Sequence, residues 1–491
     1  MFIKTLLITI CLLQAPLYAS TSIRKIFKKF IETVDHPDKR ICNNSNTDFI
    51  IATYQNIFEQ NPTDEELTNA LSLLDESNDQ SNLITIKRSD LISALLAKKY
   101  DTDQLTDSIL RKESHLIETL DSCQKSGFIP YLAVDQYLDN AEKQYSEETI
   151  KKYQLDYAAH TGNYNLYYGY MHAHTSYSDG EGLPEDAYTM ARDQAKLDFL
   201  AVTDHDMRIA IWPWNNEWKK SKKIADKFYE PGKFVAIRGF EWSSPIFGHI
   251  NVINSKRLIN CITWPTVRNL YRWMGRQEKD IFARYNHPGR VKFASWGNKL
   301  EFNQFRIYPP AIKYMAGMEM FNGDSGLWKY YFNTGYNGDK NFFNTANLNG
   351  WMIGAVGGQD NHDQSWGIKN EYRVGVWALG LTRKEIINAY QERRTFATED
   401  KNASLSFKMD GAQMGSRLHP GFKNVEIIVR DADLEIFTEI NLYKNGDLLE
   451  TINPTSDRVT LSLETQAGEY YHVIAKQADE NYIMSSPIWI K

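Results

Sequence analysis

The chain is poor in cysteine, with 4 among 491 residues and no CxxC pair. A zinc site built on thiolates is therefore not expected, because such sites use closely spaced cysteines. Cys42 and Cys123 share the N-terminal region and could form a disulfide in an oxidising compartment. The alternative is that both, together with Cys261, are small buried apolar side chains.

Beyond the first twenty residues, the sequence has no apolar stretch long enough to span a bilayer. The apolar run from Leu6 to Leu17 follows a single lysine and ends near the small residues Ala19 and Ser20. This pattern is typical of a cleaved secretory signal. We therefore expect residues 1–20 to be a signal peptide. The mature protein should be exported, either periplasmic or secreted, without stable membrane insertion.

Positive charge is not in excess, since 56 lysines and arginines face 62 acidic residues and the formal net charge is −6. A general nucleic-acid binder needs basic surface, so no nucleic-acid partner is expected. Hydrophobic residues make up 42% and charged residues 24%, which excludes a disordered chain. A length of 491 residues is enough for two or three domains.

Residues 21–160 are predicted to form an all-α domain, because apolar residues recur there at three and four positions. The stretch from Asn61 to Glu66 indicates a helix start, with a capping residue followed by acids in the first turn. No clustered histidine or cysteine lies in this domain, so it suggests no chemistry. We expect a packing module, with a docking, lid or oligomerisation role as the alternative. The sequence does not identify a protein partner for this domain.

Residues 161–400 change to short apolar stretches that end in polar residues and are followed by helix-like segments. Such alternation predicts parallel strands joined by helices, hence an α/β sheet or barrel. A helix over 382–394 is expected to close this unit. The predicted strands are 166–171, 199–202, 234–237, 250–253, 281–285, 318–321, 352–356 and 374–378.

Residues 401–491 alternate apolar and polar side chains with a period of two, which predicts half-buried strands. These are expected at 425–429, 440–443, 459–463 and 470–475, with a hairpin turn from Lys444 to Asp447. About seven short strands in this length favour a small C-terminal β-sandwich.

Six of the 11 histidines fall within the α/β segment. All lie at or just beyond the end of a predicted strand, except His249, which opens one. His172 and His174 are two residues apart on a strand, so their imidazoles point to the same face. The six are His172, His174, His205, His249, His287 and His362.

Carboxylates accompany these histidines. Asp179 follows His174 by five residues, Glu241 ends a strand eight residues before His249, and Asp360 precedes His362 by two. The carboxyl ends of parallel barrel strands converge on one face, so these groups should meet there. Any one such histidine is more often a packed residue than a ligand. The whole set at strand ends instead favours a metal centre.

A nitrogen and oxygen ligand set without thiolates suits zinc, manganese or iron. There are too many ligands for one tetrahedral ion, so we expect two or three divalent transition-metal ions, with Glu241 suited to bridge two of them. Asp204 is a candidate catalytic or supporting residue, because a ligating histidine such as His205 needs a partner for its second nitrogen. Arg290, three residues past His287, either contacts an anionic substrate group or forms a surface ion pair.

These motifs resemble the polymerase and histidinol phosphatase (PHP) superfamily of metal-dependent phosphoesterases over about residues 165–400. The resemblance rests on His172-Ala173-His174 with Ser178-Asp179-Gly180, and on Thr203-Asp204-His205, followed by Glu241, His249, His287, Asp360 and His362. It implies a distorted (β/α)7 barrel. The stretch Gly248-His249-Ile250-Asn251-Val252 and the ending Ser485-Ser486-Pro487-Ile488-Trp489 resemble the CehA/McbA branch, whose members include carbamate hydrolases.

The resemblance also implies how the ligands divide. A first metal would be held by His172, His174, Glu241 and Asp360, a second by Glu241, His249 and His287, and a third by Asp179, His205 and His362. The expected reaction is hydrolysis by a metal-bridging hydroxide.

A small-molecule phosphoester is the expected substrate, with carbamates or carboxylic esters as the rival class. A different reading is a non-catalytic exported protein that binds a glycan or a protein. The basis for this alternative is that 11 of the 12 tryptophans lie between Trp212 and Trp377. These tryptophans either line a binding pocket or pack the core.

Overall fold

The computed structural model describes residues 50–51, 54, 61–75, 145–211, 217–261, 264, 266–277, 280–290, 300–332 and 340–491. The predicted signal peptide at 1–20, Cys42 and Cys123 lie outside these residues. The chain divides into two compact units, one made of Met1–Gln144 with Lys292–Leu300 and the other of Tyr145–Val291 with Glu301–Lys491. No helix in the described ranges combines the length and apolar character needed to cross a bilayer.

In the first unit, helix α5 spans Asp64–Asp75. The Thr63 hydroxyl accepts the Glu66 amide at 3.2 Å, and the Glu66 carboxylate accepts the Thr63 amide at 2.9 Å. This reciprocal cap satisfies two backbone donors at the helix start and confirms the start predicted at 61–66. The rest of the predicted helical domain up to residue 144 falls largely outside the described residues.

The second unit begins with α10 (Glu147–Tyr153), capped by Ser146, whose side chain accepts the Thr149 amide. Residues 145–160, which the sequence placed with the helical domain, belong to this unit. Ala158 pairs with Arg417 in an isolated antiparallel bridge. Residues 145–160 therefore form a short strap that contacts the C-terminal tail at Arg417.

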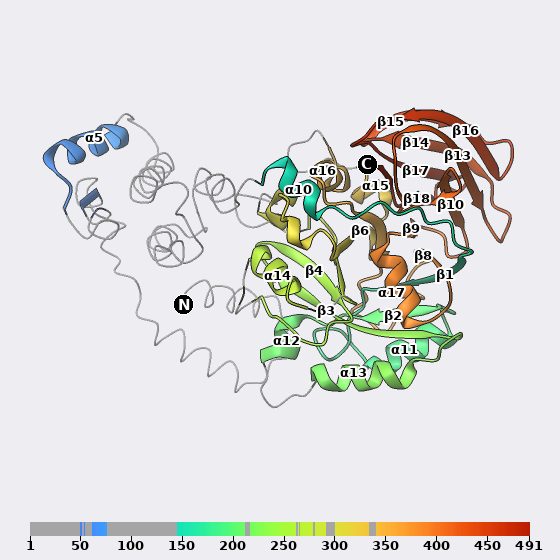
Figure 1. Cartoon of the computed structure of the whole chain (residues 1–491). Coiled ribbons are helices and arrows are strands. Elements are labelled where there is room, and N and C mark those ends of the chain that lie inside the picture. The colour runs from blue at the N-terminus through green and yellow to red at the C-terminus, as the bar shows by residue number, and fades with distance from the viewer. Residues whose placement is uncertain are drawn as a thin grey trace. The chain divides into compact units, whose positions relative to one another are not determined.

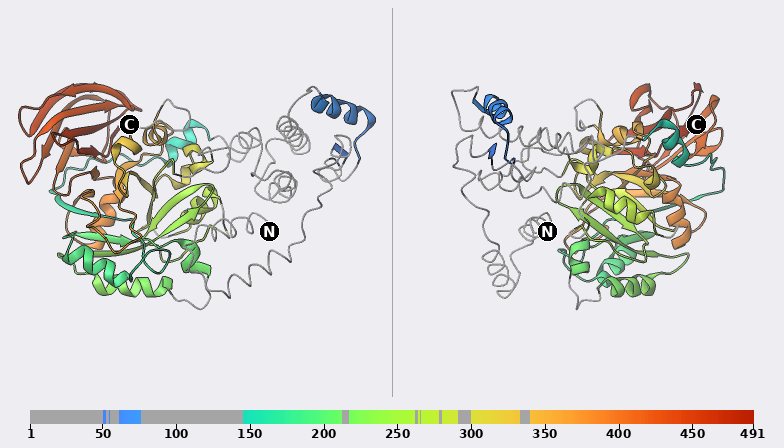
Figure 2. Two further views of the ribbon diagram at one scale, coloured as in Figure 1. Left: turned by 180° about the vertical axis from the view of Figure 1, so that it is seen from behind. Right: turned by 60° about the vertical axis from the view of Figure 1, so that its left-hand side comes forward.

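The second unit is built on a large mixed sheet, flanked by helices (Figures 1 and 2). Each of the eight strands predicted in the α/β segment overlaps an observed strand. Strands β1–β2–β3 pair in parallel, as do β5–β6–β7. The strands are β1 (Asn165–Tyr170), β2 (Phe199–Val202), β3 (Val235–Ser244), β4 (Gly248–Ile253), β5 (Phe282–Tyr285), β6 (Met315–Asn322), β7 (Gly354–Gly358) and β8 (Arg373–Ala378).

The expectation that these strands are all parallel is wrong for β4 and β8. Strand β4 pairs antiparallel with both β3 and β5, and β8 pairs antiparallel with β1. Only Pro245–Phe247 separate β3 from β4, and a parallel pair needs a much longer crossover connection. The composition of a short apolar strand does not indicate its direction. In this sequence, only the lengths of the connections indicated it.

Strand order runs from β9 through β8 and β1 to β7. Just past the ends of β1 and β7, Ala173 and Asn361 form an isolated parallel bridge. Strands β1 and β7, which are not neighbours in this order, therefore approach each other on the side where the predicted ligands lie.

Helices cover the sheet where the sequence is amphipathic. In α17 (Arg383–Gln391), Ile386, Ile387 and Tyr390 are buried, and the Thr382 hydroxyl caps the Glu385 amide. This helix lies within the one predicted at 382–394. Figure 1 shows α11 and α13 packed side by side at the end of this unit away from the tail. The remaining helices are α11 (Pro184–Asp193), α12 (Asp206–Ile211), α13 (Glu217–Phe228), α14 (Val267–Met274), α15 (Leu327–Tyr330), α16 (Phe342–Leu348) and the 3-10 turns η2 (Glu301–Phe305) and η3 (Pro309–Ala311).

The tail after residue 400 is all β and overlaps each predicted strand. A four-stranded sheet, β11-β10-β13-β16, shares one core with strands of the large sheet, and Leu405, Ile427, Leu442 and Val473 lie in that core. The tail joins the large sheet through pairing of β18 with β9. Strand β9 (Thr395–Thr398) precedes the tail. The strands of the tail are β10 (Ser404–Met409), β11 (Ala412–Gln413), β12 (Arg417–Leu418), β13 (Gly421–Arg430), β14 (Phe437–Lys444), β15 (Asp447–Ile452), β16 (Arg458–Thr465), β17 (Tyr470–Gln477), β18 (Tyr482–Ser485) and β19 (Ile488–Ile490).

Candidate metal centre

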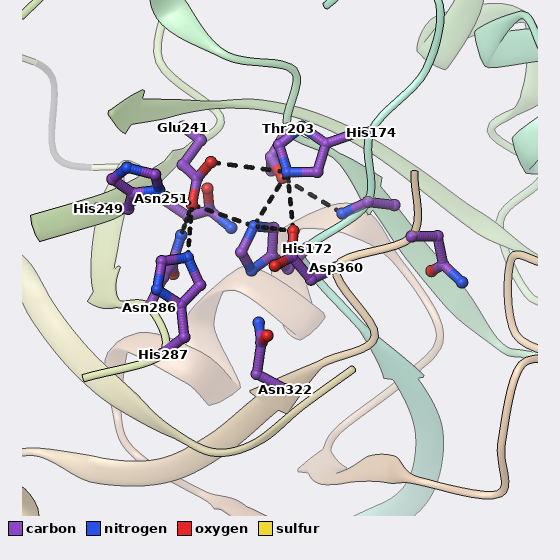
Figure 3. Close-up of polar contacts among 12 residues, drawn as sticks. His172, His174, Thr203, Glu241, His249, Asn251, Asn286, His287, Asn322 and Asp360 are labelled. Carbon is purple, nitrogen blue, oxygen red and sulfur yellow. Dashed lines mark hydrogen bonds and ion pairs between the residues drawn. The ribbon is translucent and has the colours of Figure 1, made fainter. Parts of the chain in front are cut away.

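The nine residues predicted as metal ligands come together at one edge of the large sheet. They form four overlapping groups, and within each group the ligand atoms lie within 4.8 Å of one another. His172 and His174 follow β1, His205 follows β2, and His287 follows β5. Asp360 and His362 follow β7, and Glu241 lies within β3. Segments almost two hundred residues apart thus contribute to one cluster, drawn in part in Figure 3.

The antiparallel direction of β4 explains why His249 joins this cluster although it opens a strand. Ser243, near the end of β3, is in register with His249, and Glu241 is in register with Asn251. The start of β4 therefore lies at the same edge as the end of β3. The antiparallel direction of β4 thus explains both why His249 opens its strand and why the predicted parallel direction was wrong.

His172, His174 and Asp360 form the innermost group, and both imidazoles are fully buried. The two Nε2 atoms lie 3.2 Å apart. Asp360 Oδ1 lies 3.2 Å from His172 Nε2 and 3.1 Å from His174 Nε2. Two imidazole nitrogens and a carboxylate oxygen thus face one point. Each of these atoms has a lone pair, so they need shared protons or a cation between them.

Glu241 stands at the centre of the cluster, with nitrogens of five histidines around its carboxylate. Figure 3 labels His172, His174, His249 and His287 among them. Oε1 lies 3.1 Å from His172 Nε2, 3.3 Å from His249 Nδ1 and 3.4 Å from His287 Nε2. Oε2 lies 2.8 Å from His205 Nδ1 and 3.6 Å from His174 Nε2. One buried carboxylate is therefore shared by five of the six histidines of the cluster.

Asp179, His205 and His362 form the outer group, at the more open side of the cluster. Asp179 Oδ2 lies 3.4 Å from His205 Nε2, and Asp179 Oδ1 lies 3.5 Å from His362 Nε2. His362 Nδ1 lies 2.8 Å from the Asp360 carbonyl oxygen, so this nitrogen donates its proton there. The Nε2 atom of His362 then faces Asp179. Burial lowers the pKa of His362, but Asp179 and Asp360 outweigh it, so the pKa lies above its usual value.

The electrostatics of the cluster favour ionised carboxylates. Burial raises the pKa of Glu241, but His249, His172 and His205 outweigh it and hold the pKa well below its usual range. Burial opposes ionisation of Asp360 as well, and His172 and His174 likewise hold its pKa well below the usual range. Both side chains are therefore negatively charged at neutral pH.

The histidines divide into two kinds. Burial lowers the pKa of His249 to about 4, and burial together with neighbouring His205 lowers that of His174 to about 4. Burial also lowers the pKa of His172, but Asp360, Glu319 and Glu241 raise it to about 10. His174 and His249 are thus neutral lone-pair donors, whereas His172 holds a proton that balances the carboxylates. A divalent cation would take over that role.

Glu319, in β6, is a supporting residue that the sequence analysis missed. Its Oε1 lies 2.8 Å from His172 Nδ1 and accepts from Arg284 at 2.9 Å. Its Oε2 accepts the His287 amide at 2.7 Å and Asn322 Nδ2 at 2.9 Å. The available signal was a lone acid inside the apolar stretch 315–322, which a buried strand does not tolerate without partners.

Asp204 and Arg290, the two predicted catalytic residues, lie beside the cluster. Asp204 accepts the Thr175 amide and hydroxyl at 2.8 Å each and the Ser178 hydroxyl at 2.7 Å. Its carboxylate is thus engaged with the turn that carries Asp179, not with the ring of His205. Arg290 Nη1 lies 2.7 Å from Asp360 Oδ2, and its side chain is 56% exposed.

Two predicted ligands sit in the left-handed backbone region, which non-glycine residues seldom adopt. The φ angle is 28° at His287 and 49° at Asp360. Such conformations persist where the surroundings hold them, and they concentrate at functional sites. Here the Glu319 carboxylate binds the His287 amide, and the Asp360 amide donates to the His172 carbonyl at 3.1 Å.

The donor set fits divalent transition metals. It offers imidazole nitrogens and ionised carboxylates, which are ligand types that zinc, manganese and iron take. Asp179 Oδ1 is buried without a hydrogen-bond partner, as expected of an atom aimed at a cation. Each of the nine predicted residues offers an atom to this set.

A fifth group of possible ligands consists of acids alone, namely Asp400, just before the tail, and Asp431 and Glu435 within it. There, Gln477 Nε2 donates to all three carboxylates at 3.2–3.3 Å. This group is therefore partnered by a side-chain amide and contains no histidine.

Several tryptophans of the α/β segment are core residues. Trp242, Trp351 and Trp366 are fully buried, and Trp366 Nε1 donates to the His174 carbonyl at 3.0 Å. Trp264 and Trp328 are 47% and 61% exposed. Packing thus accounts for the first three, and Trp366 also fixes the backbone of a predicted ligand.

Comparison with known proteins gives matches to parts of the chain. The family described as "Protein of unknown function (DUF3604)" matches residues 206–283, a segment that contains Glu241 and His249. An uncharacterized protein of Chlamydia pneumoniae is 23% identical over 385 residues, which are 66% of this chain and 57% of the relative. An uncharacterized protein of Chlamydia trachomatis serovar D is 23% identical over 381 residues, with the same shares. The chain thus matches a little over half the length of these relatives.

Among solved structures, the chain is similar to a two-domain protein from Bacteroides vulgatus ATCC 8482 that contains a predicted PHP-like metal-dependent phosphoesterase. The TM-score is 0.37 at 16% sequence identity, and the match covers 68% of this chain and 98% of that chain.

Proposed function

We propose that this protein is an exported metal-dependent hydrolase that acts on phosphoesters. The observation that carries the proposal is the position of Glu241, a buried carboxylate whose two oxygens lie within 3.6 Å of nitrogens from five histidines. A packed core does not gather five imidazoles around one acid, because each buried polar group costs free energy unless it is fully paired.

Two or three divalent ions fit the nine side chains. His172, His174, Glu241 and Asp360 would hold the first ion, and Glu241, His249 and His287 the second. Asp179, His205 and His362 would hold a third. Bound divalent ions supply Lewis acidity and lower the pKa of water toward neutrality.

The chain itself orients these ligands. Glu319 accepts a hydrogen bond from Nδ1 of His172, so that His172 Nε2 faces Asp360 and Glu241. His205 Nδ1 lies against the Ser243 hydroxyl, and Asn286 donates to Glu241 Oε1 at 2.7 Å. Hydrogen bonds of this kind fix the ring orientation and tautomer of ligating histidines and raise metal affinity.

Arg290 favours an anionic substrate. One guanidinium nitrogen is bound to Asp360, while the side chain is 56% exposed and leaves further donors directed to solvent. A guanidinium binds two phosphate oxygens at once, whereas a neutral carbamate or carboxylic ester gains less from it. We therefore place phosphoesters ahead of the two rival ester classes.

The resemblance of the motifs to the PHP superfamily supports the same reaction class. The parallel strand groups and the bridge past β1 and β7 are compatible with a distorted (β/α)7 barrel, and the shared core of the tail with a β-sandwich. Because the stretches 248–252 and 485–489 resemble the CehA/McbA branch, carbamates are also to be tested as substrates.

The test combines metal quantification with a panel of an aryl phosphomonoester, an aryl phosphodiester, an aryl carbamate and an aryl carboxylic ester. We expect two or three equivalents of transition metal and turnover of a phosphoester. His174→Ala should lose both metal and activity. His419→Ala, an exposed histidine in the tail, is the matched control and should keep both.

Turnover of only carbamates or carboxylic esters would remove the phosphoesterase assignment and leave the metal hydrolase. A folded protein that binds no metal at micromolar free concentration would overturn the proposal as a whole.

A further inference from the structure

A cavity of about 370 Å³ lies at the edge of the sheet away from the candidate metal centre. Strand β3 places Arg238 at the cavity and, three residues further on, Glu241 at the metal centre. Likewise, Ile281 lines the cavity just before β5, and His287 lies beyond its other end. Six residues of extended chain span roughly 20 Å, so the cavity is separate from the nine-residue cluster.

The cavity is strongly basic. Of its two acids, Asp226 is already paired with Lys222 at 2.5 Å and with Arg383 at 2.8 Å. The other acid, Asp280, is exposed and also lines the cavity. Five separate segments of the chain contribute to the basic set, which comprises Lys222, Arg238, Lys256, Arg257, Arg276 and Arg383.

Arg238 is the buried base of this set, with an exposed fraction of 8%. Its guanidinium donates to the carbonyls of Trp218 at 2.9 Å and Ser255 at 2.5 Å, and it stacks 3.5 Å from the centre of the Trp218 ring. In the part of the chain that the structure describes, no carboxylate lies within ion-pair distance of it. Burial lowers the pKa of Arg238 to about 10, so it stays charged at neutral pH.

A buried cation without a counter-charge is costly, and a bound anion would offset that cost. Arg257 and Arg276 are exposed, and they add two more guanidinium groups to the same cavity. Guanidinium groups bind phosphate and carboxylate through paired hydrogen bonds. The cavity volume falls in the range of small-molecule sites and is far too small for a folded partner.

We propose that this cavity binds a small multivalent anion that carries phosphate or carboxylate groups. The proposal does not depend on the hydrolase assignment, because none of the nine predicted metal ligands lines the cavity.

Isothermal titration calorimetry at physiological salt tests the proposal with two probes, pyrophosphate and citrate. The full-length protein is first passed over an immobilised chelator, because soluble chelators are themselves multivalent anions. We expect one anion per chain. The double variant Arg257→Gln/Arg276→Gln should weaken binding by about tenfold or more, since it removes two charged donors.

The matched control is Lys219→Gln/Lys223→Gln, which removes the same charge from exposed positions of α13 outside the cavity and should bind like the wild type. His174→Ala should also bind like the wild type, because it alters only the candidate metal centre. Tighter binding of pyrophosphate would identify phosphate as the preferred group, and tighter binding of citrate would identify carboxylate.

Three results would overturn the proposal. They are the absence of binding for both probes at millimolar concentration, an unchanged affinity in a folded Arg257→Gln/Arg276→Gln variant, and loss of binding in His174→Ala alone. Circular dichroism establishes that each variant is folded. Arg257 and Arg276 are exposed, so their replacement leaves the core intact.

Discussion

Glu319 Oε1 lies 2.8 Å from His172 Nδ1, and this contact determines which ring nitrogen of His172 faces the cluster. The second oxygen of Glu319 accepts the backbone amide of His287. One fully buried carboxylate therefore orients two predicted ligands that are 115 positions apart in numbering. Its own charge is balanced by Arg284, which donates to Oε1 at 2.9 Å.

Replacing Glu319 should weaken metal binding without touching a ligand. For Glu319→Gln we expect a loss of about 10–100-fold in metal affinity, the usual effect of removing a partner of a ligating histidine. Glu319→Ala should in addition destabilise the fold by about 3–5 kcal/mol, because it leaves buried Arg284 without its counter-charge. Competition with a metal indicator and urea unfolding measure the two effects. Glu371→Gln, which affects an exposed ion pair with Lys401, is the control and should change neither.

Replacing Asp204 should disturb the turn that carries Asp179. Asp204→Asn keeps the shape but directs an amide nitrogen at the Thr175 and Ser178 donors, at a cost of about 1–3 kcal/mol. Metal bound through the outer group should be lost first. Unfolding in urea and metal stoichiometry measure this. If Asp204→Asn keeps full stability but abolishes turnover, Asp204 acts on the substrate directly instead.

Gly358 should not tolerate a side chain. A Cβ added there would lie 2.4 Å from the His172 Cβ atom and 2.7 Å from Glu319 Oε1. Gly358→Ala should therefore displace the His172–Glu319 contact and lower the metal content. Gly380→Ala is the matched control, since nothing lies within 4 Å of an added Cβ at that position. Equal metal content in the two variants would show that the contact is dispensable.

Metal removal should destabilise the protein. A ligand that binds only the folded state at one hundred times its Kd contributes about 2.7 kcal/mol, so chelation should lower the Tm measurably. Re-addition of zinc, manganese or iron should restore it in the wild type but not in His174→Ala. Differential scanning calorimetry with and without chelator measures the shift. An identical Tm in both conditions would contradict a resident metal.

Stability should fall in acid partly because of His472, which is far in sequence from the cluster and fully buried. Burial lowers the pKa of His472 from 6.5 to about 3. Between these values the unfolded chain binds a proton that the folded chain does not. The free energy of unfolding therefore decreases as the pH falls below about 6.5, by up to about 1.4 kcal/mol per pH unit for this group.

His472→Phe should flatten this pH dependence. The variant also removes the contact between His472 Nε2 and the Tyr331 hydroxyl, which lowers stability by a similar amount at every pH and leaves the slope unaffected. His160, whose pKa burial and Arg394 lower to about 4, is present in both proteins and cancels in the comparison. Urea unfolding between pH 4 and 7 measures the slopes, and parallel curves for the two proteins would contradict the prediction.

The sequence predicted the positions of the strands in the second unit better than their directions. Apolar runs such as 199–202 are buried at every position, so their composition alone marks them as strands. Direction depends on the length of the connection and on pairing with neighbours. The connection of only Pro245–Phe247 before β4 was the available signal for its antiparallel direction.

The supporting residues were harder to predict than the residues of the cluster. Histidines at strand ends are rare enough to attract notice, and His172, His174 and the other predicted ligands were selected on that basis. Glu319 and Arg284 are single charges within short buried strands, which indicates that they need partners but does not indicate which partners. Their function depends on neighbours from other segments, such as Gly357, whose carbonyl accepts Arg284 Nη1 at 2.7 Å.

The sequence by itself determined which chemical groups are present and that each follows or opens a short apolar strand, because side-chain chemistry and hydrophobic periodicity are local properties. Tertiary structure alone decided that Glu241 lies among five imidazoles and that Asp204 binds a turn instead of His205. It also decided that a basic cavity forms around Arg238, apart from the metal centre. These are matters of distance between segments far apart in the chain. Such distances follow from strand pairing and packing, which no single stretch of residues encodes.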